Sequence, residues 1–160
     1  MRKDLIALSD DSKVWVYQAD KTVDDDTEQR IKEDLHDFSM NWLSHGTPVD
    51  CYVNLFHKRF LVFVADDTNH VSGCSIDSSV HFIKALEQKY GLNFFDRLTF
   101  AYVKDDEFRF IHNSNLNPAY KSGQITDDTR MVNNLVKSKE EFLSSWIIPL
   151  KESWYKKLIR

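Results

Sequence analysis

The chain of 160 residues has little of what small proteins use to cross-link or bend their backbone: it contains two cysteines, three prolines and four glycines. Two cysteines do not make a disulfide framework, so we expect free thiols and a reducing compartment, the cytoplasm. Long apolar runs are also missing. A membrane-spanning helix needs about 20 apolar residues and a signal peptide needs an apolar core of roughly 7–15, so the sequence predicts neither.

A surplus of positive charge is absent as well. The 21 Lys and Arg residues are outnumbered by 25 Asp and Glu residues, and the formal net charge is −4. No segment dense in Lys and Arg restores a basic patch. Because nucleic-acid binding depends on neutralising phosphates, we expect no nucleic-acid partner.

Apolar and aromatic residues, in contrast, are plentiful, at 42% and 13% of the chain. This composition suits one substantial core, so we expect residues 1–160 to form a single domain. The patterns predict strand, helix, two strands, helix and two strands, with the strands at residues 13–17, 49–56, 60–65, 98–103 and 108–112.

Capping signals delimit the two helices. The first is predicted to begin at a capping box of Thr22 and Asp25 and to end at His45-Gly46, and the second to run from about Ser75 to Gly91. This order of elements matches an α+β ferredoxin-like sandwich (βαββαββ), in which two helices cover one face of a mostly antiparallel sheet.

The other face of that sheet also needs a cover, because the strands carry apolar residues on both alternating sets. We expect residues 113–160 to be a C-terminal extension that packs on this core or on a partner subunit. This tail is predicted to contain a short strand within residues 131–136 and a helix that begins at Ser138 and that Pro149 ends or kinks.

The most informative segment leads from a loop into the second helix. A helix N-terminus presents unpaired N–H groups and a partial positive charge, so it can bind an anion. The candidate ligand-binding residues here are Gly73, Cys74, Ser75, Asp77, Ser78 and Ser79. In this hypothesis Ser75 and Ser78 hold a small anion or a partner's acidic group, while Asp77 caps the helix.

Positive charge for that anion is expected from Arg97, with His57 or Arg59 as alternatives. The same serines and the aspartate also fit a purely structural role as helix caps, since these residue types are preferred wherever a helix begins.

A thiol-dependent enzyme or redox protein is the second hypothesis. Cys74, Asp77 and His81 are three and four residues apart, a spacing that places side chains on one face of a helix. A thiol at a helix N-terminus can have a lowered pKa, and His81 would be its base. Cys51, by contrast, lies in a predicted strand among apolar residues and is expected to be part of the core.

The six histidines show no H-x-H or H-E-x-x-H spacing, so the sequence predicts no metal site and no cofactor. Trp154 lies in an otherwise polar stretch and is a candidate interface anchor. A homodimer that buries the second sheet face is therefore a third hypothesis.

Five segments carry a resemblance that spans almost the whole chain: residues 15–19, 72–79, 94–97, 133–136 and 149–154. In them the chain resembles a family of short, uncharacterised bacterial proteins that are often labelled ABC-transporter ATPases. The resemblance implies no established activity or catalytic residues.

The ATPase label fails against the residues themselves. An ATP-binding cassette needs a phosphate loop, G-x-x-x-x-G-K-[ST], and the four glycines of this chain are far apart with none before a lysine. The expected function is accordingly a binding or interaction module rather than an enzyme.

Overall fold

The computed structural model describes residues 1–66 and 73–160, except that only the backbone of residue 74 is described. The α-helices in the described part are α1 (Asp25–Asn41), α2 (Gly73–Tyr90), α3 (Leu116–Ser122) and α4 (Lys139–Ser145). The strands are β1 (Lys13–Gln18), β2 (Leu43–Ser44), β3 (Thr47–Pro48), β4 (Cys51–Phe56), β5 (Phe60–Ala65), β6 (Thr99–Lys104), β7 (Glu107–His112), β8 (Arg130–Val132) and β9 (Ile147–Pro149). The α+β class is confirmed.

The first sheet has the antiparallel order β1-β5-β4. β4 and β5 form a hairpin, and its turn takes His57 and Lys58 through positive φ angles. The six consecutive residues of β5 are all buried. A strand that is apolar on both alternating faces needs packing on both sides of its sheet, and this requirement explains the layers on either side.

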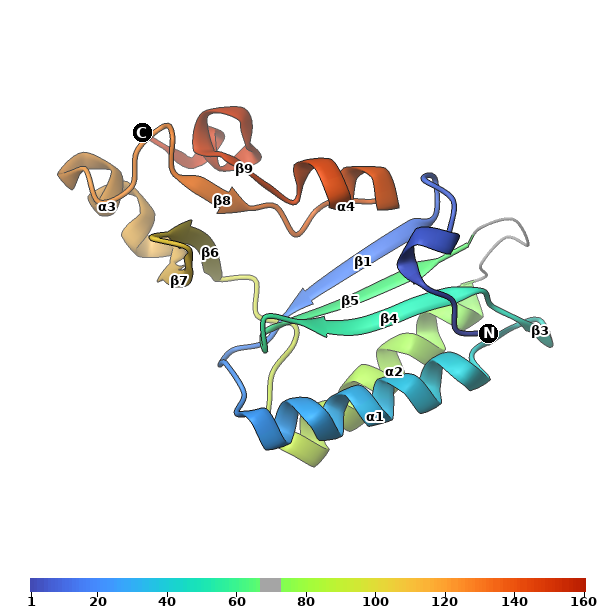
Figure 1. The fold of residues 1–160 in the computed structure, drawn as a ribbon. Coiled ribbons are helices and arrows are strands. Elements are labelled where there is room, and N and C mark those ends of the chain that lie inside the picture. The colour runs from blue at the N-terminus through green and yellow to red at the C-terminus, as the bar shows by residue number, and fades with distance from the viewer. Residues whose placement is uncertain (67–72) are drawn as a thin grey trace.

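One face of this sheet is covered by α1 and α2, which lie side by side across it (Figure 1). Ile31 and Leu35 of α1 and Ile83 of α2 have no exposed surface and pack in one cluster with Val53 of β4. Full burial of such a side chain stabilises the folded state by about 1.5–3 kcal/mol.

The opposite face is covered by the C-terminal part of the same chain, which Figure 1 shows above the sheet. Val14, Val62 and Val64 of the sheet cluster there with Val132 and Phe142. Apolar residues on both faces of one sheet are therefore buried within a single chain.

The strand order differs from the predicted ferredoxin-like one. β6 and β7 do not extend the first sheet but form a second, antiparallel sheet of order β7-β6-β8-β9. The edge of β1 is instead occupied near Ser138, because the Val14 N–H donates to the Lys137 carbonyl at 3.0 Å. The two apolar sheet faces favour this arrangement, since a strand pair used as a covering layer buries more apolar surface than one added at an edge.

Several predicted boundaries also need correction. Asp24 rather than Thr22 caps α1, where its carboxylate accepts from the Thr27 N–H at 2.8 Å. The helix ends at Asn41, before the small β2–β3 hairpin. Ser138 caps α4 as predicted, but α4 ends at Ser145, and Pro149 lies in β9.

None of the described helices combines the length and apolar character required to cross a membrane.

Candidate functional site

The serines at the start of α2 are engaged within the protein. Ser75 is 2% exposed and Ser79 6% exposed, so both face the interior. The Ser75 hydroxyl donates to the Leu43 carbonyl at 2.9 Å, and the Ser75 carbonyl accepts from Trp42 Nε1 at 3.0 Å. The Ser79 hydroxyl donates to the Ile76 carbonyl at 2.6 Å. The two hydroxyls thus join α2 to the β2 strand and to its own backbone.

The remaining candidates of this segment point elsewhere. Asp77, Ser78 and His81 are exposed, and the Ser78 hydroxyl donates to the Ser75 carbonyl at 2.8 Å. Because α2 begins at Gly73, Asp77 is the fifth residue of the helix, so its predicted capping role is wrong. The Cys74 side chain lies outside the described residues, so its proposed partnership with His81 stays a prediction.

Arg97 is not brought to this segment. It follows the C-terminal end of α2, whose 18 residues span about 27 Å at 1.5 Å per residue. The two alternative cations contact aromatic rings of the protein. Arg59 is buried with its guanidinium 3.5 Å from the centre of the Phe110 ring, and the centre of the His57 ring lies 4.5 Å from that of Phe108. The predicted anion site is therefore split between the two ends of one helix.

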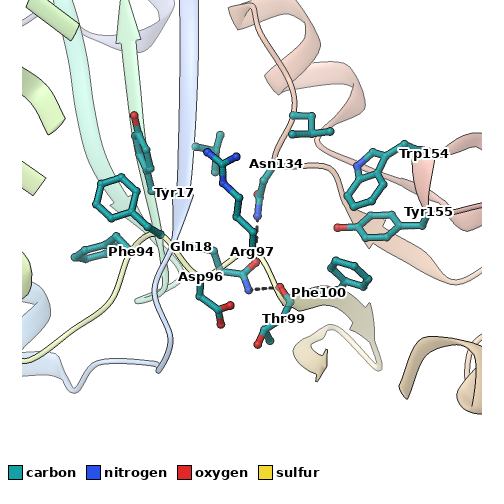
Figure 2. A pocket seen from close by; sticks show the side chains of 13 residues that line it. Tyr17, Gln18, Phe94, Asp96, Arg97, Thr99, Phe100, Asn134, Trp154 and Tyr155 are labelled. Atoms are coloured by element: carbon teal, nitrogen blue, oxygen red, sulfur yellow. Dashed lines mark hydrogen bonds between the residues drawn. The ribbon is translucent and has the colours of Figure 1, made fainter. Parts of the chain in front are cut away.

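A cavity of about 250 Å³ lies beside Arg97, where the first sheet meets the C-terminal part of the chain (Figure 2). It is lined by Val16, Tyr17, Gln18, Phe94, Phe95, Asp96, Arg97, Thr99, Phe100, Asn134, Leu135, Trp154 and Tyr155. Arg97 and Leu135 are both exposed, so solvent reaches the cavity at these residues. Its volume is slightly below the usual range for ligand sites, about 300–1,000 Å³, and suits a molecule of one or two rings.

Local turns fix the segment that presents Arg97. The Asn93 side chain accepts from the Phe95 N–H at 2.8 Å, and the Asp96 carboxylate accepts from the Leu98 N–H at 2.8 Å. Such short-range bonds between Asn or Asp and the backbone two residues on are typical of tight turns. They hold the backbone on both sides of Arg97 while its side chain extends into the cavity (Figure 2).

A chain of hydrogen bonds forms one wall and joins the two sheets. Gln18 Nε2 donates to the Thr99 carbonyl at 3.0 Å, Asn134 Nδ2 donates to Gln18 Oε1 at 3.1 Å, and Trp146 Nε1 donates to Asn134 Oδ1 at 3.1 Å. Figure 2 draws the first two bonds as dashed lines. The amides of this wall are therefore oriented by the protein before any ligand arrives.

Two charged side chains line the cavity, Arg97 and Asp96. The Arg97 guanidinium makes no hydrogen bond or ion pair with the residues that the structure describes. Burial raises the pKa of the Tyr17 hydroxyl, and the positive charge of Arg97 offsets part of that rise. Partial burial also acts to raise the pKa of the Asp96 carboxyl, but hydrogen bonds from Leu98 and Thr99 outweigh it and hold that pKa below its usual value.

Aromatic rings form the far wall. Trp154 and Tyr155 are stacked with ring centres 3.9 Å apart, and Phe100 meets Trp154 edge-on at 5.6 Å. The Tyr155 hydroxyl donates to the Val132 carbonyl at 2.7 Å, and burial raises its pKa far above the usual value. Trp154, predicted as an interface anchor, packs here against rings of its own chain.

Cys51 belongs to the core. It has no exposed surface, and burial raises the pKa of its thiol to about 11, so little thiolate forms near neutral pH. Within residues 1–66 and 73–160, no three His, Cys, Asp or Glu residues come together as a metal site.

The sequence patterns did not predict this cavity, although many of its lining residues lie in segments that carry the family resemblance. Four of the five segments that carry the family resemblance contribute to its lining: residues 15–19, 94–97, 133–136 and 149–154. Their joint occurrence was the signal available in the sequence, and only the tertiary structure places them together. An exposed cation beside aromatic walls can bind an acidic molecule with an apolar body.

Comparison of the chain with protein-family models, with curated proteins and with solved structures finds no match.

Proposed function

We propose that the protein is a binding module whose ligand is a small aromatic or otherwise planar acid, held in the cavity beside Arg97. The observation that carries this proposal is the Arg97 guanidinium, which lies at an open cavity and has no partner among the described residues. A guanidinium binds a carboxylate or phosphate through two parallel hydrogen bonds, an arrangement that is stronger than a neutral hydrogen bond.

The walls determine the rest of the ligand. Trp154 and Phe95 are both half-buried lining residues, and their rings offer flat apolar surfaces that favour a ring in the ligand. The volume of about 250 Å³ excludes large cofactors such as a dinucleotide. The cavity therefore suits a compact acid better than a nucleotide or a peptide.

A binding role fits this lining better than catalysis. The cavity is lined by no cysteine or histidine in the part of the chain that the structure describes. The hydroxyl of Tyr155 is already bonded to a backbone carbonyl, and burial raises its pKa, so it is a poor general base.

The test uses 2-naphthoate as probe and the neutral 2-naphthamide as its matched control, with binding measured by isothermal titration calorimetry. We expect the wild-type protein to bind the acid at least tenfold more tightly than the amide. Arg97→Gln is expected to weaken 2-naphthoate binding about tenfold or more, since a hydrogen-bonded charge contributes roughly 1.5–3 kcal/mol.

Arg30→Gln is the control variant, because Arg30 is also exposed but lies on α1, away from the lining residues. It should bind 2-naphthoate as the wild type does. Equal losses in both variants would show a non-specific charge effect and would contradict the proposal, as would equal affinity of the acid and the amide.

The earlier hypotheses stay predictions of lower rank. These are anion binding at residues 73–79, thiol chemistry at Cys74, membership of the bacterial family named above, and residence in the cytoplasm. A homodimer also stays a prediction, but the second sheet face is covered by the same chain and does not form its interface. The inward hydrogen bonds of Ser75 and Ser79 favour the cavity over the helix N-terminus as the place where an acid binds.

A further inference from the structure

Trp154 carries a hydrogen-bond donor that the protein leaves unused. Its indole nitrogen Nε1 is buried and has no hydrogen-bond partner among the described residues. A buried N–H group without an acceptor is rare in folded proteins, because it gives up its bond to water and gains nothing in return. Such a donor at the wall of a cavity therefore needs an explanation.

Two other tryptophans show what this protein does with a buried indole. Trp42 Nε1 donates to the Ser75 carbonyl at 3.0 Å, and Trp146 Nε1 donates to Asn134 Oδ1 at 3.1 Å. The first bond spans 33 residues of the sequence and the second spans 12. Trp154 departs from this pattern, and it is also the one of these three indoles that lines the cavity.

The position of the ring is fixed by its neighbours. The indole lies against Tyr155 at an interplanar angle of 25° and meets Phe100 at 89°. Figure 2 shows the nitrogen at the edge of the ring that is turned toward Asn134 and the cavity. A ring held on two sides does not turn to find an acceptor elsewhere.

The neighbouring side chains do not supply that acceptor. Asn134 Oδ1 accepts from Trp146, and Gln18 Oε1 accepts from Asn134. Both oxygens are held in the bonds that join the two sheets, and neither accepts from Trp154 Nε1.

We infer that the ligand of this cavity carries, besides its acidic group, a hydrogen-bond acceptor on the ring system itself, such as a ring nitrogen or a carbonyl oxygen, which accepts from Trp154 Nε1. This inference rests on the proposed binding of an acid beside Arg97. It narrows the ligand class from planar acids in general to heteroaromatic or oxo-substituted ring acids.

The experiment compares 2-naphthoate with the quinoline-3-, quinoline-6- and quinoline-7-carboxylates. These probes share one shape and differ in whether, and where, a ring nitrogen replaces a C–H group. We expect one quinoline isomer to bind wild-type protein at least fivefold more tightly than 2-naphthoate. Trp154→Phe keeps an aromatic wall and removes the N–H, so this preference should fall to less than twofold.

A second measurement does not depend on the variant. In a ¹H–¹⁵N spectrum of labelled wild-type protein, the preferred isomer should move the Trp154 indole N–H resonance downfield, whereas 2-naphthoate should leave it near its free position. The spectrum of Trp154→Phe assigns the peak, or an assigned wild-type spectrum does so if that variant fails to fold.

The outcomes separate the two proposals. If 2-naphthoate binds through Arg97 but no isomer exceeds it, or if Trp154→Phe weakens all four probes equally, Trp154 is only a wall and the inference is overturned while the proposed function stands. If none of the acids binds, both are overturned.

Discussion

The two ends of α2 differ in what their polar residues do. At the N-terminal end, the hydroxyls of Ser75 and Ser79 donate to backbone carbonyls inside the protein. Beyond the C-terminal end, Arg97 is exposed, has no described partner and lies at a cavity. Both ends carry residue types suited to an anion, but the Ser75 and Ser79 hydroxyls donate inside the protein, whereas the Arg97 guanidinium has no partner among the described residues. The chemistry of a site therefore depends on which donors the fold has already used.

The largest expected effect is on the wall that joins the two sheets. Gln18→Ala removes a side chain that is 4% exposed and leaves Asn134 and the Thr99 carbonyl without their partner. We expect a loss of about 2–3 kcal/mol in the free energy of unfolding, measured by urea denaturation. 2-Naphthoate binding should weaken as well, because the wall lines the cavity.

Gln88→Ala is the matched control, since Gln88 is exposed on α2. It should change the free energy of unfolding by less than about 0.5 kcal/mol. If Gln18→Ala lowers the free energy of unfolding no more than Gln88→Ala does, the hydrogen bonds of Gln18 and Asn134 do not hold the two sheets together.

A smaller effect is expected at the N-terminal end of α2. Ser75→Ala leaves the Leu43 carbonyl without its donor and should cost about 1–2 kcal/mol of unfolding free energy. The affinity for 2-naphthoate should not change, because Ser75 does not line the cavity.

Ser78→Ala serves as the control at the same end, because Ser78 is exposed. Ser78→Ala should lower the free energy of unfolding by less than about 0.5 kcal/mol. A loss of acid binding in Ser75→Ala without a loss of stability would reverse the comparison and favour the helix N-terminus as the site.

The smallest effect concerns the contact that holds the C-terminal end of α2 to α1. Asp34 accepts hydrogen bonds from Tyr90 at 2.5 Å and Lys89 at 2.9 Å. Partial burial acts to raise the pKa of the Asp34 carboxyl, but these bonds and the positive charges of Lys89 and Arg30 outweigh it, so the pKa is lower in the folded protein than in the unfolded chain. Asp34→Asn should cost about 1 kcal/mol at pH 7.

The lowered pKa also predicts how this difference varies with pH. A carboxyl whose folded pKa is depressed stabilises the protein above its unfolded pKa, and this stabilisation is lost as the pH falls through the folded pKa. The difference between wild type and Asp34→Asn should thus be constant from pH 7 to about pH 5 and shrink below about pH 4. Asp37→Asn, an exposed neighbour on α1, should cost less than about 0.5 kcal/mol. If the difference in unfolding free energy between wild type and Asp34→Asn grew as the pH fell, the lowered pKa of Asp34 would be contradicted.

Local signals identified most elements of the fold correctly. The β4–β5 hairpin and the strand pair β6–β7 were predicted because alternating β-branched and aromatic residues are bounded by polar turns. Gly91 follows the last residue of α2 and takes a φ of +65°, a conformation that favours glycine. Ser138 caps α4 for an equally local reason.

Pairing between distant segments was not predictable in the same way. Nothing within residues 99–112 distinguishes a strand pair that extends the first sheet from one that packs over it. The choice depends on β8 and β9, which are three residues each and give weak patterns. The burial of Ser75 and Ser79 was not predictable for the same reason, because it comes from the docking of α2, and the acceptor of the Ser75 hydroxyl, Leu43, is distant in sequence.

The sequence by itself determined the α+β class, the hairpins, the helix cap at Ser138 and the need to cover two apolar sheet faces, because these follow from side-chain periodicity and from bonds within a few residues. The tertiary structure alone decided which layer covers the second face, which donors remain unused and that Arg97 and Trp154 line one cavity. Those properties arise when segments more than 50 residues apart come together, and their energies depend on burial, which a local pattern does not specify.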